Sequence, residues 1–341
     1  MTRLFTTGFE LGVREWNSAH ANMTWSTTSK RTGDRAVSLL ATVDAAYFSH
    51  AFAANQTELY FRFAIVFDSF AASQGQTGFL TLYDHNNNSQ LIFDFVAGAQ
   101  TIRVKDGGGS TLATGWLTLD VDAWYLIEIY IKCDASGTVT IKINNTTDFT
   151  YSGDTDYRGT TTLRRFQFYG GGQAGYTKGF LLDDLAVNNA SGSYQTTYAG
   201  LGGVYYLKPN GEGATATWTP STGTVHYTMV DENPRNTTDW IQATDTGDID
   251  LFELEDSPSY VNTINLVQVL YSAGVTESGY NLLMDVVRHG TVNYSDGTST
   301  IVTVTPAYLL YFGTAYYVQA GGTTAWGTTD IDALQAGVEI A

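Results

Sequence analysis

The chain has 341 residues, of which 43% are hydrophobic, and its 34 acidic and 17 basic residues give a formal net charge of −17. A chain of this length is typical of two domains of ~100–200 residues each. The acidic excess argues against nucleic acid as a partner, because phosphate binding needs a basic surface. The single cysteine, Cys133, excludes an intrachain disulfide and a cysteine-based zinc site.

Secretion and membrane signals are missing from the sequence. The N-terminal segment Met1–Gly8 lacks the apolar stretch of a signal peptide. No apolar run approaches the ~18 residues that a membrane-spanning helix needs. We therefore expect synthesis in a cytoplasm and no membrane partner.

The first half of the chain is predicted to consist of strands. Apolar and polar residues alternate with a period of two, which is the pattern of half-buried strands. The segments are Glu58–Phe67, Gln90–Val96, Trp124–Lys132, Thr138–Ile143, Arg165–Tyr169 and Gly179–Val187. A short turn containing Gly137 joins the third and fourth segments and predicts a hairpin. Turn signals at this spacing favour a β-sandwich.

The alternation lapses between Asn188 and Gly203, where the residues are small and polar. We predict a first domain over 1–192, a linker over 193–203 and a second domain over 204–341. The second domain resumes the strand pattern, and Thr328–Gly337 predicts its short helix, with a polar N-cap and a closing glycine. A terminal strand follows over Val338–Ile340. The expected fold class is all-β, with two β-sandwich domains, the second one smaller.

Four segments of the first domain occur in the order of a known fold family. They are Thr7–Glu10, Arg31–Leu39, the hairpin Trp124–Asn145 and Phe180–Val187. In this order they resemble the concanavalin A-like lectin/glucanase jelly roll in its laminin G-like form. The resemblance implies a jelly-roll domain, with glycan on a host surface as a partner.

The second domain resembles a domain of tailed-bacteriophage virion structural proteins. The segments that carry the resemblance are Asp231–Pro234, Thr246–Pro258 and Ala325–Glu339. It implies a protein of the virion surface that contacts capsid or tail subunits. We also expect a homo-oligomer, with a trimer favoured.

Two groups of residues are candidate binding sites. Asp183 and Asp184 lie where laminin G-like domains close their sheet, and adjacent carboxylates supply the oxygen ligands that Ca²⁺ prefers. In a regular strand, however, neighbouring side chains point to opposite faces. The polar turn of Asp84, His85, Asn86 and Asn87 offers amides and an imidazole to a sugar, although such turns also satisfy turn geometry alone. No cofactor other than Ca²⁺ is expected.

A catalytic set is not evident in the sequence. Retaining glycoside hydrolysis needs two carboxylates about 5 Å apart, and the first domain lacks a strand motif of the form Glu-x-Asp-x-x-Glu. The nearest spacing, Asp248–Glu253, lies in the second domain, where the solvated edge of a strand explains it.

We therefore expect a non-enzymatic virion surface protein, of the capsid-decoration or head-fibre type. Two alternatives stay open. One is a tail-tip or tail-fibre receptor-binding protein, and the other is a carbohydrate-active enzyme of the glucanase jelly-roll class.

Overall fold

The computed structural model describes residues 3–11, 18–19, 22–39, 46–70, 78–96, 98–170, 178–275, 281–295, 297, 300–302 and 308–341. The chain divides into two compact units, Met1–Tyr205 and Tyr206–Ala341. The described elements are strands apart from one α-helix and two short 3₁₀ turns, η1 (Tyr157–Gly159) and η2 (Tyr227–Met229). This confirms the predicted all-β fold class.

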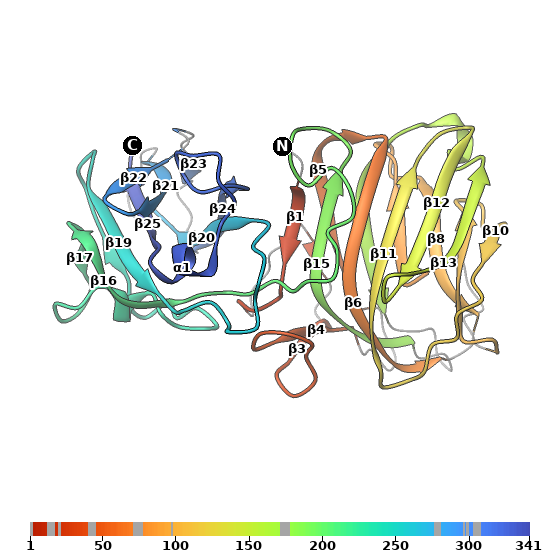
Figure 1. Cartoon of the computed structure of the whole chain (residues 1–341), viewed down its shortest axis with the longest axis horizontal. Helices are drawn as coiled ribbons and strands as arrows, with labels where there is room; N and C mark the ends of the chain where they lie inside the picture. The colour runs from red at the N-terminus through yellow and green to blue at the C-terminus, as the bar shows by residue number, and fades with distance from the viewer. Residues whose placement is uncertain are drawn as a thin grey trace. The chain divides into compact units, whose positions relative to one another are not determined.

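The first unit contains an eight-stranded sheet in its described part, with the order β13-β12-β11-β6-β15-β4-β3 and with β1 paired to β15. Figure 1 shows β15, β6, β11, β12 and β13 side by side in this sheet. The strands are β1 (Arg3–Thr7), β3 (Thr24–Ser26), β4 (Ala36–Ser38), β6 (Glu58–Phe70), β11 (Trp124–Lys132), β12 (Gly137–Ile143), β13 (Thr146–Gly153) and β15 (Lys178–Asn189).

A seven-stranded sheet, again counted over the described residues, packs against the first one. Its order is β10-β9-β8-β7-β14-β5-β2, and its paired strands are antiparallel. The strands are β2 (Ser18–Ala19), β5 (Ala46–Gln56), β7 (Leu80–Tyr83), β8 (Ser89–Val96), β9 (Thr101–Asp106), β10 (Thr111–Thr114) and β14 (Leu163–Gly170). The two sheets form the predicted sandwich.

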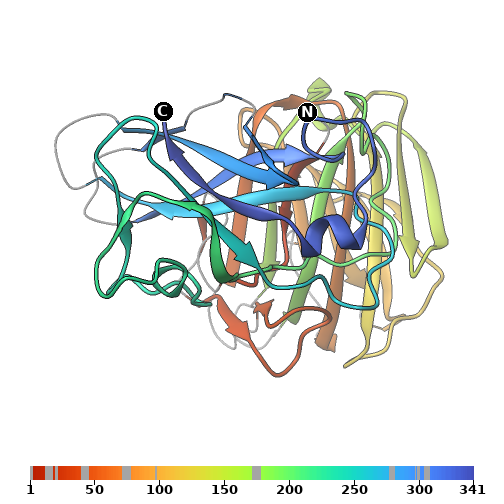
Figure 2. The ribbon, with the colours of Figure 1, turned by 60° about the vertical axis from the view of Figure 1, so that its left-hand side comes forward.

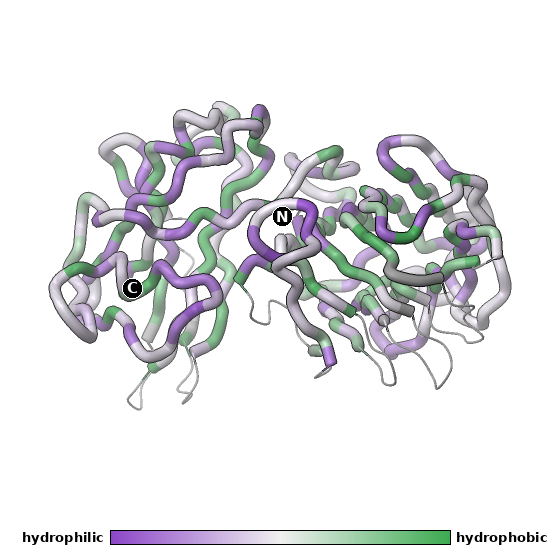
Figure 3. The backbone as a smooth tube through the Cα atoms, turned by 90° about the horizontal axis from the view of Figure 1, so that it is seen from below, coloured by the Kyte–Doolittle hydropathy of each residue, from purple (hydrophilic) through white to green (hydrophobic). Residues whose placement is uncertain are grey.

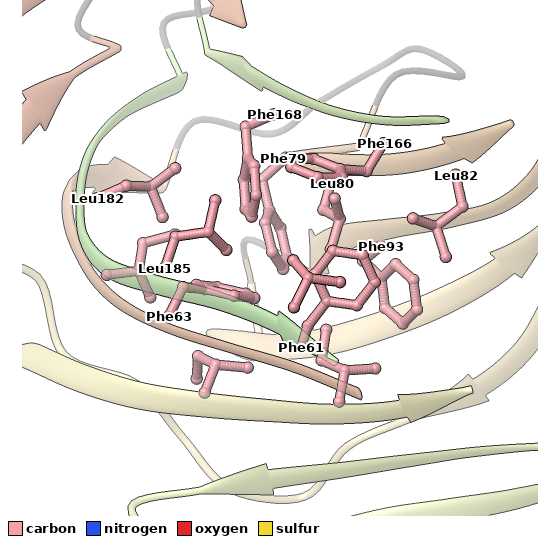
Figure 4. Close-up of a cluster of buried hydrophobic side chains, with 14 of the residues drawn as sticks. Phe61, Phe63, Phe79, Leu80, Leu82, Phe93, Phe166, Phe168, Leu182 and Leu185 are labelled. Carbon is pink, nitrogen blue, oxygen red and sulfur yellow. The ribbon is translucent and has the colours of Figure 1, made fainter. Parts of the chain in front are cut away.

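The core of the first unit lies between the sheets, because one side of each strand is apolar. Phe61 and Phe63 of β6 meet Phe166 and Phe168 of β14, with ring centroids 5.5 Å apart for Phe61 and Phe166 and 5.0 Å apart for Phe63 and Phe168. All four rings are fully buried, and Figure 4 shows them within one cluster. Figure 3 shows hydrophobic and hydrophilic stretches following one another along the backbone.

The segment after β15 packs on the outer face of the eight-stranded sheet. The N–H of Gly200 donates to Glu128 Oε1 at 2.9 Å, and the ring of Tyr198 stands edge-on to Tyr60 at 5.3 Å. Lys142 Nζ lies 3.9 Å from the centroid of the Tyr198 ring. The residues predicted as the linker 193–203 therefore form part of the first unit's packing.

The second unit is built around a six-stranded sheet in its described part, with the order β16-β19-β25-β21-β22 and with β23 paired to β21. Two two-stranded sheets, β17–β18 and β20–β24, accompany it. The strands are β16 (Pro209–Ala216), β17 (Thr219–Pro220), β18 (Ile241–Gln242), β19 (Ile249–Leu254), β20 (Val267–Ala273), β21 (Asn281–His289), β22 (Val292–Tyr294), β23 (Thr300–Val302), β24 (Leu309–Tyr316) and β25 (Gln335–Ile340).

The helix of the second unit, α1 (Thr328–Asp332), is shorter than predicted. The sequence predicts a helix over Thr328–Gly337, but Gln335–Gly337 belong to β25, which pairs with β19 and β21. Figure 2 shows α1 close to the strands of its own unit, where Ile331 packs with Trp326 in a small buried cluster. No helix among the described residues is long and apolar enough to cross a membrane.

Candidate functional site

The predicted glycan-binding turn joins β7 to β8. Asp84 is buried, and its carboxylate accepts the N–H groups of Asn86 and Asn88 at 2.8 Å each, as well as the side-chain amides of Asn88 and Gln90. Burial would raise the pKa of Asp84, but the hydrogen bonds from Asn88 and Asn86 outweigh it and hold the pKa below its ordinary value. The carboxylate of Asp84 therefore stabilises the turn and is not presented to a ligand.

The other three residues of that turn face solvent. His85, Asn86 and Asn87 are exposed, and Asn87 has a φ of 62°, in the left-handed region that asparagine tolerates in turns. These features agree with an ordinary polar turn. Glycan binding by the three exposed side chains stays a prediction.

Asp183 and Asp184, the predicted calcium ligands, are both fully buried. The register between β15 and β6 shifts between Asp183 and Ala186, and Asp184 has a φ of 55°. Because of this bulge, both carboxylates reach the segment Arg31–Thr32. The expectation that the two side chains point to opposite faces is therefore wrong, since it assumes a regular strand.

The four oxygens of this pair all accept hydrogen bonds. Asp183 Oδ2 accepts the N–H groups of Arg31 and Thr32, and its Oδ1 accepts the N–H of Asp184. Asp184 Oδ2 lies 2.5 Å from Arg31 Nη1, while its Oδ1 accepts the Thr32 hydroxyl and the N–H of Val204. A calcium ion would compete with these donors.

A third carboxylate, that of Glu10, lies in the same buried region. Its Oε2 accepts the N–H groups of Asp34 and Arg35, whereas its Oε1 is buried without a hydrogen-bond partner. Burial raises the pKa of Glu10 to about 7, and burial together with the charge of Asp184 raises the pKa of Asp183 to about 8. No group of three or more His, Cys, Asp or Glu suited to a metal ion occurs among the described residues. Calcium binding stays a prediction.

A larger set of polar side chains lies on the outer face of the seven-stranded sheet, opposite the core. One row of paired residues runs across six of its strands. Gln167 of β14 pairs with Ser49 of β5 and with Thr81 of β7. The same row continues through Ile92 of β8, Lys105 of β9 and Thr111 of β10. Because every second residue of a strand points to the same face, the neighbouring rows add further polar groups. We call this surface the outer β14 face.

Two tyrosines stand side by side at one end of the outer β14 face. Tyr47 of β5 pairs with Tyr169 of β14, and their rings stack with centroids 6.5 Å apart and an interplanar angle of 8°. Both side chains are half-buried. Stacking presents the two phenol groups next to each other.

An arginine lies two residues before Gln167 on the same strand and the same face. The Arg165 guanidinium lies 3.9 Å from the centroid of the Tyr83 ring, and its Nη1 donates to Gln167 Oε1 at 2.9 Å. Arg165 is half-buried. Stacking on a ring and a hydrogen bond hold the planar guanidinium in one place, which suits the recognition of a carboxylate.

Asp94 of β8 holds two more basic groups on this face. Its carboxylate accepts two hydrogen bonds from Arg103, at 2.9 and 2.7 Å, and lies 2.6 Å from Lys105 Nζ. The Asp94 carboxylate is 1% exposed, whereas the side chains of Arg103 and Lys105 keep 24% and 11% of their surface. Both cations therefore keep some access to a ligand, while the buried Asp94 carboxylate fixes their positions.

This face was not predicted from the sequence. The signal available was the spacing of two in Arg165-x-Gln167-x-Tyr169 and in Arg103-x-Lys105, which places these groups on the side opposite the buried phenylalanines. Such side chains are more often the solvated side of a strand, so the spacing alone does not indicate a site.

The carboxylate spacing of the second unit does not form a site of the glucanase kind. Asp250 is fully buried and binds His226 Nδ1 at 2.6 Å and the N–H of Trp218 at 2.9 Å, whereas Glu253 is exposed. The solvated-edge explanation is wrong for Asp250, since β19 lies between β16 and β25.

The chain is similar to known proteins in structure but not in sequence. The sequence matches no family model and no curated protein. Similar solved structures include an endo-β-1,4-glucuronan lyase from the fungus Trichoderma reesei, with 14% identity, a TM-score of 0.41 and coverage of 55% of this chain and 96% of that chain. The alginate lyase Aly36B has 13% identity, a TM-score of 0.33 and coverage of 47% and 83%. The carbohydrate-binding module CBM66 from Bacillus subtilis has 9% identity, a TM-score of 0.31 and coverage of 50% and 94%. At these identities the likeness is one of fold alone.

These structures are carbohydrate-active proteins, and they contradict two predictions from the sequence. The predicted role as a virion structural protein on a capsid or tail is wrong, and so is the prediction that the chain is not an enzyme. The jelly-roll part of the resemblance agrees with the similar structures, while the bacteriophage part has no support. The absence of a carboxylate pair bears on hydrolysis, and other carbohydrate chemistry does not share that requirement. The homotrimer stays a prediction.

Proposed function

We propose that the outer β14 face binds an acidic polysaccharide and cleaves it by β-elimination beside a uronate residue. The observation that carries this proposal is the set of Arg165, Gln167 and the stacked pair Tyr47 and Tyr169 on one face. A fixed guanidinium and amide bind a carboxylate, and two adjacent phenols supply proton transfer.

The charge of the face supports an anionic substrate. The whole chain has a formal net charge of −17, yet this face carries Arg103, Lys105 and Arg165, and the one acid described above, Asp94, is occupied by two of them. A local basic surface on an acidic protein attracts an anionic polymer and orients it toward the face.

The bond changes of the reaction fit these groups. Arg165 and Gln167 bind the uronate carboxylate and stabilise the negative charge that develops on it when C5 loses its proton. One tyrosine of the pair, as phenolate, takes that proton, so that the C5–H bond breaks. A C4–C5 double bond forms as the bond from C4 to the leaving oxygen breaks, and the other tyrosine, as phenol, protonates this oxygen. Proton exchange with solvent then restores the pair.

Hydrolysis by a carboxylate pair fits the same face less well. It requires a carboxylic acid and a carboxylate about 5 Å apart when configuration is retained. Both oxygens of Asp94 are engaged, by Arg103 and by Lys105, and Asp84 is taken up by its turn. Elimination by Arg165, Gln167 and the tyrosine pair therefore fits this face better than hydrolysis does.

The test is the formation of a conjugated double bond, measured by ultraviolet absorbance, when the full chain is incubated with glucuronan, with alginate or with a neutral glucan. We expect a signal with a polyuronate and none with the glucan. Arg165→Ala should lower the rate by ~10²–10³-fold, the usual effect of removing one group that stabilises a developing oxyanion.

The matched control is Arg288→Ala, because Arg288 lies in the second unit and its Nη1 donates to Asn293. The control should retain the full rate. Polyuronate binding without double-bond formation, or equal rates for Arg165→Ala and the unchanged chain, would overturn the proposal.

A further inference from the structure

Trp116 is a large apolar side chain that is exposed just beyond the last strand of the seven-stranded sheet. It follows β10, an edge strand of the seven-stranded sheet, and 66% of its surface is exposed. Burying an indole would stabilise the free protein. A tryptophan that stays exposed at the edge of a binding face is therefore a candidate contact for a ligand.

The backbone at Trp116 is held firmly. Asp148 Oδ1 accepts the N–H groups of both Trp116 and Leu117 at 2.8 Å, and Asp148 is 2% exposed. The N–H of Gly115 donates to the carbonyl of Ile102, and a side chain at Gly115 would meet Asp148 Oδ2 at 1.9 Å. The indole is thus presented from a rigid base and loses little freedom on binding.

The register of the sheet brings the end of β10, just before Trp116, beside the basic groups. Thr114, two residues earlier, pairs with Arg103, and Arg103 pairs with Asp94. Four strand spacings separate β14 from β10. At about 4.8 Å each they amount to about 19 Å, which is the length of about four sugar units. A polysaccharide that crosses the strands from the tyrosine pair would pass Arg103 and Lys105 and arrive near Trp116.

We propose that Trp116 is an outlying subsite, where the indole stacks on the apolar face of a sugar ring of the bound polysaccharide, about four units from the cleaved bond. The inference rests on the proposed function and adds a requirement on substrate length. Oligouronates too short to reach β10 are bound by the central residues alone. Longer chains gain the stacking contact, which holds them across the sheet.

The experiment measures the dissociation constants of oligoglucuronates of increasing length, from two units to eight, together with the kcat and KM for glucuronan. The variants are Trp116→Ala and Trp116→Phe in the full chain. The control is Trp240→Ala, which removes a tryptophan that is 38% exposed in the second unit. Thermal unfolding of each variant shows that it is folded.

For the unchanged chain we expect affinity to rise about tenfold between the dimer and the octamer. Trp116→Ala should abolish this rise and increase the KM for glucuronan by a similar factor, with kcat unchanged and dimer affinity unaffected. Trp116→Phe should keep most of the rise, and Trp240→Ala should keep all of it.

Failure of this inference is distinguishable from failure of the proposed function. If the unchanged chain binds and cleaves glucuronan but Trp116→Ala retains the full dependence on length, the subsite is refuted and the proposed function stands. If the unchanged chain neither binds nor cleaves any of the oligomers, both are refuted.

Discussion

Replacing Glu10 by glutamine should make the stability of the first unit less dependent on pH. The glutamine oxygen can accept the N–H groups of Asp34 and Arg35, as Glu10 Oε2 does, and its amide takes the place of the unpartnered Oε1. The variant therefore keeps the hydrogen bonds and removes only the ionisation.

The sign follows from the raised pKa of Glu10, which burial moves from 4.5 to about 7. The folded chain binds this proton more tightly than the unfolded chain does. The stability that the protonated form contributes is fully present below the unfolded pKa and is lost as pH rises through the folded pKa. At about 1.4 kcal/mol per pKa unit, the difference between the unfolded and the folded pKa of Glu10 limits this loss of stability to about 3 kcal/mol.

The assay is urea unfolding of the unchanged chain and of Glu10→Gln at about pH 5 and about pH 8, with a chelator present. We expect similar stability at the lower pH and an advantage for Glu10→Gln of up to about 3 kcal/mol at the higher pH. Glu253→Gln, at an exposed position of the second unit, should change neither value. Equal pH dependence in Glu10→Gln and the unchanged chain would refute the reasoning.

Added calcium provides a second arm of the same assay. If the ion binds Asp183 and Asp184 near Glu10, it should stabilise the unchanged chain at about pH 8, which lies above the pKa of Glu10, and it should stabilise Glu10→Gln less. The absence of any stabilisation by calcium would contradict the calcium prediction while leaving the pH argument intact.

Three further predictions concern the core and the outer β14 face. Phe166→Ala should destabilise the first unit by about 3–5 kcal/mol in urea unfolding, because the ring is fully buried among other phenylalanines. Asp94→Asn should weaken glucuronan binding, measured by calorimetry, even though it removes a negative charge from the face, because Arg103 and Lys105 lose their common partner; tighter binding would refute the positioning of these two cations by Asp94. Tyr169→Phe should lower kcat for glucuronan by ~10²–10⁴-fold with little change in KM, and an unchanged kcat would remove Tyr169 from the reaction.

Hydrophobic alternation located the strands well because it reports directly which side of a strand meets the core. The predicted strand Trp124–Lys132 coincides with β11, and the predicted partner Thr138–Ile143 lies within β12. The helix over Thr328–Gly337 was predicted too long, because capping signals describe local preference, whereas pairing of Gln335–Ile340 with two strands is tertiary.

The candidate site was not predictable in the same way, because it consists of the sides of strands that point away from the core. Gln167 meets Ser49 and Thr81 only through sheet pairing, across more than eighty intervening residues. The placement of Asp183 and Asp184 was missed for a related reason, since a bulge at Asp184 overrides the alternation that the sequence suggests.

The central claim, that the outer β14 face cleaves a polyuronate by elimination, is tested most directly by mass spectrometry of glucuronan products formed in isotopically labelled water. Elimination predicts that one new chain end is lighter by one water than a hydrolysis product and that neither end carries the label. Products that incorporate labelled oxygen at the cleaved bond would show hydrolysis and contradict the account.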